Sequence, residues 1–291
     1  MLIAIENNNL RGTVDTFGGE LIALTDGYYD YLWGGDEKFW IGRSPHLFPI
    51  IGTLKNNELK ADNHIFTIGK HGFLRNSEFS ISKKNKDSVV LYLESNEETL
   101  NMYPFRFTFY VTHTLTDKGV ITSYKIVNED DKNIYFNVGG HVGVKCPLQL
   151  GEEFSDYEIT FSEALTKKVY FPENDEPIKW ESAVPFFYNN NSLELSHDYF
   201  KKGPMIIDSI EAKSLILRSK KSNNGIKFIY EDYPVLALWT FGEKKAPYIC
   251  LEPWHGLPAM DGDEDFGEKP YSIALAPGEN KRLSYQIEIM E

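Results

Sequence analysis

The amino-acid sequence predicts an all-β protein, a large antiparallel β-sandwich. Apolar and polar residues alternate with a period of two, which places successive side chains on opposite faces of a strand. Helical periodicity is weak along the chain, and clusters of Gly, Asn and Pro separate the alternating segments. Together these three observations are typical of an antiparallel protein with many strands and functional loops.

The clearest pair of strands lies near residue 115. An alternating segment rich in phenylalanine runs over residues 105–115. Residues 116–119, Thr-Asp-Lys-Gly, follow as a turn, because Gly readily adopts positive φ. Residues 120–127 then return as a second alternating segment, so the sequence predicts an antiparallel hairpin.

Further strands are expected on both sides of this hairpin, at residues 88–94, 134–138, 157–161, 214–217, 226–230, 235–241, 248–251 and 283–289. Turns are predicted at residues 34–35, 139–140, 189–191, 223–225 and 276–278. Two short helices are expected, at residues 162–165 and 196–200. No repeat with a period of about 20–50 residues is visible. Since no low-complexity linker divides the chain either, we expect a single domain over residues 1–291.

Composition and charge argue against several classes of partner. The chain has 30 Lys and Arg against 43 Asp and Glu, a formal net charge of −13. Nucleic acid is therefore not expected, because phosphate binding depends on clustered basic residues; the densest basic stretch, residues 218–221, is interpreted as a solvated loop. No apolar run of about 18 residues and no leader peptide is visible, so no membrane partner is expected. The spacing of Cys146 and Cys250 indicates reduced thiols in a cytoplasmic protein.

Two segments in the first third of the chain carry candidate binding residues. Arg43 and His46 lie in a segment with two Pro and two Gly, residues 40–52. A guanidinium there could donate hydrogen bonds to ligand oxygens, or could simply be solvated. His71 precedes Gly72, which exposes the imidazole and lets the backbone approach a ligand.

Two later segments carry candidate proton-transfer groups. His141 lies in an apolar, glycine-rich stretch, and its ordinary pKa of about 6.5 suits a proton donor near neutral pH. The alternative is a buried histidine with all hydrogen bonds satisfied. Glu252 is expected at the end of an apolar strand that Pro253 stops, where burial would raise its pKa and make it a better base, unless it pairs with a Lys. Trp254 beside it could offer an apolar face to the C–H groups of a sugar.

The combination and order of these segments resemble the aldose 1-epimerase (galactose mutarotase-like) family, and most of all its LacX-like bacterial branch. The resemblance extends over nearly the whole chain, from residues 18–21 to 276–279. Its blocks are collinear: SPHLFP at 44–49, HGFLR at 71–75, LSHDYF at 195–200 and APYICLEPW at 246–254.

This resemblance implies a fold, a reaction and roles for five residues. The fold is the supersandwich of galactose mutarotases, and the reaction is an isomerisation that opens and closes a sugar ring. Glu252 matches the general base and His141 the general acid, while Arg43, His71 and Asp198 match sugar-binding positions. No metal and no other cofactor is implied, and the expected partner is a small-molecule monosaccharide, bound by a monomer or homodimer. The residues that follow His141 differ from the family pattern, so the sugar itself is left open.

Three alternatives remain at this stage. Glu252 paired with Asp261 or Asp263 would give a hydrolase with two carboxylates. A non-catalytic sugar-binding or regulatory protein could keep the same fold. Arg43 and Arg75 could instead meet a phosphate, as a hexose-phosphate epimerase would require.

Overall fold

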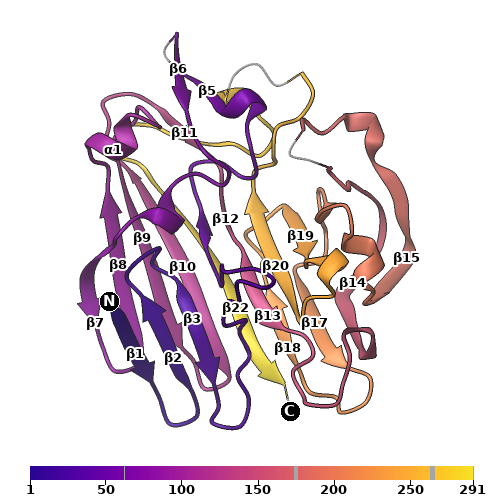
Figure 1. The fold of residues 1–291 in the computed structure, drawn as a ribbon. Helices are drawn as coiled ribbons and strands as arrows, with labels where there is room; N and C mark the ends of the chain where they lie inside the picture. Colours follow the sequence, from indigo (N-terminus) through magenta and orange to yellow (C-terminus); the bar gives the residue numbers. More distant parts are fainter. Residues whose placement is uncertain (62, 174–175, 263–265, 291) are drawn as a thin grey trace.

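The larger layer of the fold is a nine-stranded antiparallel sheet, shown in Figure 1. The structure is a computed structural model that describes residues 1–61, 63–173, 176–262 and 266–290. The strands of this sheet follow in the order β15 (Val184–Glu194), β14 (Tyr157–Val169), β17 (Ser214–Ser219), β18 (Gly225–Ile229), β22 (Asn280–Met290), β10 (Gly119–Asn128), β9 (Phe107–Leu115), β8 (Ser88–Glu94) and β7 (Ser80–Lys84).

A six-stranded and a three-stranded sheet lie against this layer. The six-stranded sheet contains β16 (Met205–Ile207), β19 (Val235–Trp239), β20 (Tyr248–His255), β12 (Val138–Gly140), β4 (His46–Leu47) and β13 (Val142–Lys145). The three-stranded sheet contains β1 (Leu2–Glu6), β2 (Arg11–Asp15) and β3 (Leu21–Thr25), which lie in front of β7 and β8 in Figure 1. Ile249 and Leu251 of β20 share one buried apolar cluster with Leu283 and Ile287 of β22, so the sheets enclose a common core.

The remaining elements are short. Two small sheets pair β5 (Glu58–Ala61) with β6 (His64–Thr67), and β11 (Ile134–Phe136) with β21 (Ile273–Leu275). The helices are α1 (Glu97–Leu100) and the 3₁₀ turns η1 (Lys55–Asn57), η2 (Leu74–Asn76), η3 (Phe154–Asp156), η4 (Trp180–Ser182), η5 (His197–Phe200), η6 (Gly242–Lys244) and η7 (Phe266–Glu268). None of the helices in the described ranges has the length and apolarity needed to cross a bilayer.

The predicted all-β sandwich and its central hairpin are confirmed. β9 and β10 pair antiparallel from Leu115 opposite Val120 to Phe107 opposite Asn128. The predicted helix at residues 162–165 is wrong, because this segment lies inside β14, where the pairing with β15 shifts register. The predicted turn at residues 189–191 is also wrong: it lies in β15 at the same irregularity, and Asn189 takes φ 57° there.

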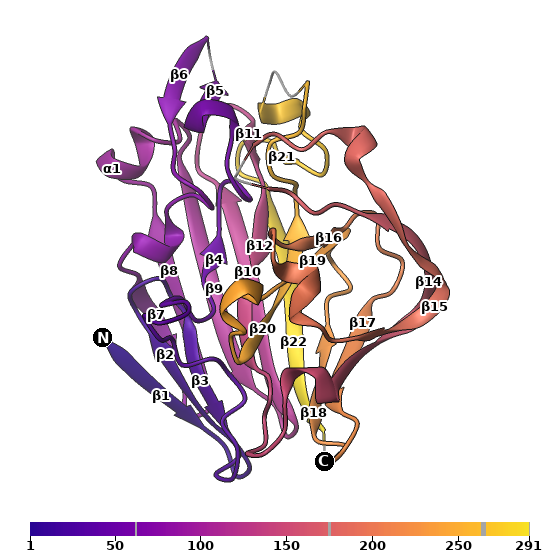
Figure 2. The same ribbon diagram turned by 45° about the vertical axis from the view of Figure 1, so that its right-hand side comes forward.

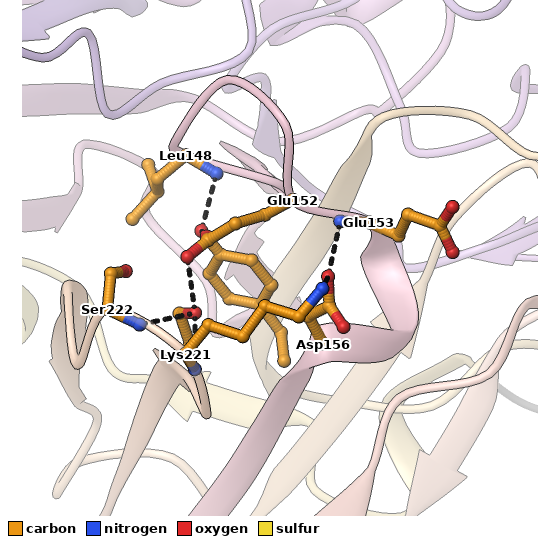
Figure 3. A network of polar contacts seen from close by, with 8 residues as sticks. Leu148, Glu152, Glu153, Asp156, Lys221 and Ser222 are labelled. Atoms are coloured by element: carbon orange, nitrogen blue, oxygen red, sulfur yellow. Dashed lines mark hydrogen bonds and ion pairs between the residues drawn. The ribbon is translucent and has the colours of Figure 1, made fainter.

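The basic stretch at residues 218–221 is paired with acidic side chains. Figure 3 shows the part of this network around Lys221, whose Nζ lies 2.7 Å from Asp156 Oδ2. Ser219 is buried at the end of β17 and donates its hydroxyl to Glu152 at 2.7 Å, so only part of the predicted loop is a loop. Arg218 pairs with Glu158 at 3.3 Å. Because neighbouring carboxylates neutralise these cations, the stretch offers little net positive charge to a polyanion.

Candidate functional site

His141 and Glu252 face each other at a break in the six-stranded sheet. His141 is the single residue between β12 and β13. β13 pairs with β20 up to Leu251, and β12 pairs with it from Trp254 onward. In the described pairing, Glu252 lies opposite this gap, and its Oε1 is 3.3 Å from Nε2 of His141.

The prediction that Pro253 ends its strand is wrong. β20 continues through Pro253 to His255, so Glu252 lies inside the strand and is only 2% exposed. A proline cannot donate a ladder hydrogen bond, but the partner strand is interrupted here, and the missing N–H is therefore tolerated. The predicted turn at residues 139–140 is also wrong, because both glycines lie in β12 and pair with β4. Gly139 is needed there for space, since a Cβ would lie 2.7 Å from the Trp254 ring.

A cavity of about 450 Å³ opens over the pair. In Figure 2 the strands β19 and β20, which contribute lining residues to this cavity, lie near the centre of the molecule. It contains four of the predicted site residues: His71, His141, Glu252 and Trp254. Its other lining residues are Trp40, Pro45, Gly52, Thr53, Lys70, Arg75, Pro172, Glu176, Ile178, Lys202, Gly203, Pro204, Trp239 and Pro258.

His71 is held at the cavity wall by backbone hydrogen bonds. Its N–H donates to the Gly52 carbonyl at 2.7 Å, and the Gly52 N–H donates to His71 Nδ1 at 3.1 Å. Burial, together with the nearby charges of Lys70 and Arg75, holds the pKa of His71 well below 6.5. Because Nδ1 accepts a hydrogen bond, the neutral ring carries its proton on Nε2 and can donate it to a ligand oxygen.

Burial favours the uncharged forms of both His141 and Glu252. It lowers the pKa of His141 to about 3 and raises the pKa of Glu252 well above 4.5. Lys70 opposes the second shift by favouring the Glu252 carboxylate. The Trp254 indole also favours it, although Nε1 makes no hydrogen bond of normal geometry to a described residue. The pair therefore holds one titratable proton over a broad pH range and can take or give one at the cavity floor.

Two predicted binding residues lie outside the cavity lining. Arg43 donates from Nε to the Gly34 carbonyl at 2.7 Å. Asp198 lies in η5 with a side chain that is 75% exposed, and it pairs with Lys201 at 2.7 Å. The structure instead brings Arg75, from the HGFLR block, to the cavity wall.

Neither His46 nor Asp261 lies in the lining of the cavity that holds His141 and Glu252. Both ring nitrogens of His46 are satisfied in the core, by the Tyr124 hydroxyl at 2.7 Å and the Gly19 carbonyl at 2.9 Å. Asp261 is exposed and is not among the lining residues, and Asp263 lies outside the described residues. The described residues therefore do not place Asp261 with Glu252 as a hydrolase would need.

Trp40 and Trp239 are site residues that the sequence reasoning missed. Both line the cavity and both contact the ring of His141. Trp40 stands at the start of the segment that also contains Arg43, but no pattern in that segment tells which side chain turns inward.

Together with Cys250, the side chains of His141 and Glu252 have the composition of a metal site. The ligand atoms of His141, Cys250 and Glu252 lie within 4.8 Å of one another, and all three residues are buried. Ligands bound to one zinc ion lie about 3.5 Å apart, so this group would have to contract to hold zinc. Burial also raises the pKa of the Cys250 thiol well above 9.0, which disfavours the thiolate that binds metals.

Comparison with known proteins gives consistent matches over the full chain. The model of the family described as aldose 1-epimerase matches residues 1–288. The chromosomal and the plasmid LacX proteins of Lactococcus lactis subsp. lactis are each 33% identical over 300 residues, covering 100% of both chains. Among solved structures, a galactose mutarotase related enzyme from Lactobacillus acidophilus has a TM-score of 0.94 at 28% identity, covering 100% of this chain and 98% of that one. A galactose mutarotase-like protein from Lactobacillus casei has a TM-score of 0.90 at 30% identity, covering 100% of both chains.

Proposed function

The chain belongs to the aldose 1-epimerase family, and on this basis we propose that it interconverts the α and β anomers of an aldohexose by acid–base catalysis. The observation that carries the proposal is the contact between His141 Nε2 and Glu252 Oε1, 3.3 Å apart at a cavity that also presents His71. The anomeric oxygen O1 and the ring oxygen O5 are bonded to the same carbon. Two groups that lie side by side can therefore serve both oxygens at once.

The proposed ring opening exchanges two protons with the sugar and breaks one bond. The single proton of the pair first moves from Glu252 to His141 Nε2 across their 3.3 Å contact. The Glu252 carboxylate then takes the proton of the O1 hydroxyl while the His141 imidazolium gives its Nε2 proton to O5, and the C1–O5 bond opens. The C1 aldehyde rotates about C1–C2, and O5 attacks its opposite face. Glu252 then returns a proton to O1 as His141 recovers the proton from O5. The open-chain stage leaves both groups uncharged, which is the form that burial favours.

Polarimetry tests this proposal directly. The optical rotation of freshly dissolved α-glucose or α-galactose drifts slowly to equilibrium in buffer. The protein is expected to speed this drift in proportion to its concentration. A non-catalytic sugar-binding protein would leave the rate at its buffer value, which would reject the proposed enzyme.

The value of kcat/KM is expected to be highest where His141 and Glu252 together carry one proton. Below the pKa of about 3 for His141 a second proton binds and the base is lost. Above the raised pKa of Glu252 the last proton leaves and the acid is lost. The acid limb should therefore lie below 4.5, the ordinary value of a Glu, in buffers corrected for their own catalysis. An acid limb at or above 4.5 would contradict the shared proton.

A phosphorylated aldose is a second candidate substrate, because the cavity is more basic than the protein. Lys70, Arg75 and Lys202 line it, against the exposed carboxylate of Glu176 and the carboxyl group of Glu252, which burial favours uncharged, in a chain whose net charge is −13. Arg75 uses one Nη2 hydrogen bond on the Lys70 carbonyl, at 3.0 Å, and its guanidinium has further donors. Lys202 instead pairs with the Glu173 carboxylate at 2.8 Å, which offsets part of its charge, so Arg75 is the stronger candidate for contact with a phosphate.

Arg75→Gln is expected to change the affinity for a phosphorylated sugar more than the affinity for a free sugar. It should weaken binding of an aldohexose 6-phosphate about 10-fold or more relative to the free sugar, since a charge-assisted hydrogen bond is lost. Calorimetric titration with galactose and galactose 6-phosphate measures this ratio. Arg282→Gln, which removes the same charge from the exposed face of β22, is the matched control. Equal losses for both sugars would remove the phosphate candidate.

A further inference from the structure

Trp40 covers one face of the His141 ring. The two ring centroids are 4.8 Å apart with an interplanar angle of 31°. Trp239 meets the same imidazole edge-on at 5.7 Å and 78°, and His71 does so at 5.7 Å and 89°. Three aromatic rings therefore contact the imidazole, and of these Trp40 is the nearest and the least inclined to its plane.

Trp40 is itself fixed in place. Its carbonyl accepts hydrogen bonds from Trp33 Nε1 at 2.9 Å and from the Asp36 N–H at 3.0 Å. Two glycines make room for its indole: a Cβ at Gly42 would lie 2.5 Å from the ring, and one at Gly143 would lie 3.2 Å from it. The indole can therefore act as a rigid wall for the imidazole.

The ring nitrogen of His141 that points away from Glu252 is Nδ1, and no hydrogen bond of normal geometry to a described residue holds it. This nitrogen is buried, although the backbone of His141 itself favours the protonated ring. A catalytic histidine is usually oriented by an acceptor at the nitrogen that does not react. Here Glu252 contacts Nε2 alone, so the ring contacts must set the rotation of the imidazole.

We propose that Trp40 is a positioning residue for the proposed epimerisation. Its indole holds Nε2 of His141 toward Glu252 and keeps water away from Nδ1. This inference rests on the proposed function for its catalytic consequence, but the contact and its effect on the imidazole belong to the free protein.

Removing the indole should change the titration of His141. The groups that face this imidazole are Glu252 and His71, the charges of Lys70 and Arg75, and the buried Cys250 thiol. These groups stay in place in a Trp40 variant, while water gains access to Nδ1. Relief of burial raises the pKa of His141, and the lost attraction between imidazolium and indole lowers it. The first effect is expected to dominate for so deeply buried a group.

The experiment combines histidine NMR titration of the free protein with polarimetry. In Trp40→Ala the pKa of His141 should rise toward 6.5, its ordinary value, and kcat/KM should fall about 10–100-fold, mainly through kcat, with the acid limb at higher pH. Trp40→Phe, which keeps a flat ring, should recover most of both properties. Trp180→Ala, a change of the same size at a half-exposed side chain outside the cavity lining, should leave both unchanged.

The two measurements distinguish the positioning role of Trp40 from the proposed epimerase activity. An unchanged His141 titration in Trp40→Ala would overturn the positioning role, whatever the activity. If the wild-type protein does not speed mutarotation, the proposed function fails, while the titration still decides whether Trp40 controls His141. Should Trp40→Ala not fold, Trp40→Leu keeps part of the apolar bulk without a flat ring, and it should raise the pKa of His141 in the same direction by a smaller amount.

Discussion

Replacing Glu252 with Gln is expected to lower kcat/KM for mutarotation at least ~100-fold, because an amide cannot take the O1 proton. His141→Asn should cause a loss of similar size, since an amide side chain cannot give a proton to O5. The loss should appear mainly in kcat, because both variants keep polar groups that can hold the sugar in place. Progress curves from polarimetry on a fresh α-anomer measure both parameters.

Both variants should keep the fold. Burial favours the uncharged form of Glu252, so a neutral Gln of almost the same shape replaces it with little loss of stability. Glu194→Gln, at a side chain that is 79% exposed, and His64→Asn, at an exposed position on β6, are the matched controls. Near-normal activity in Glu252→Gln or His141→Asn, with circular dichroism unchanged, would remove that residue from the mechanism.

Gly72→Ala is expected to be the most damaging single-methyl change near the site. Gly72 has φ 73°, and a Cβ there would lie 2.0 Å from the carbonyl oxygen of Phe48. Because this neighbour is backbone, it cannot move aside as a flexible side chain could. The free energy of unfolding in urea should fall by about 3 kcal/mol or more. His71 should also lose its place, since it immediately precedes the strained residue.

Gly69→Ala is the control for this prediction. It adds the same methyl group three residues earlier, where no heavy atom lies within 4 Å of the added Cβ. Its effect on unfolding should stay within about 0.5 kcal/mol. Equal stability of the two variants would show that the close contact between Gly72 and Phe48 does not constrain this loop.

The alternation of side chains predicted the strands well where one face of a strand is buried and the other is not. β8, β9 and β10 have this pattern and were predicted within two residues at each end. The N-terminal strands β1–β3 were not predicted. In β1 the exposed positions include Leu2 and Ala4, and in β3 the half-buried positions include Ile22 and Ala23, so apolar residues on both faces hide the alternation. The segment 162–165 contains good helix formers, and its pairing position in a long strand overrides their preference.

Residue chemistry together with the family resemblance singled out His141, Glu252, His71 and Trp254, which line one cavity, and also Arg43 and Asp198, which do not. A histidine or glutamate in an apolar, glycine- or proline-marked segment is costly to bury, and this cost is visible without coordinates. Which arginine and which tryptophan accompany them was decided by the fold. Arg75 and Trp40 turn toward the cavity while Arg43 is held by the Gly34 carbonyl. A side chain's direction depends on the strands packed beside it, and these come from distant parts of the chain. His141 and Glu252 meet only because β12, β13 and β20 pair around a one-residue break, an arrangement set by strand register and not by any local pattern.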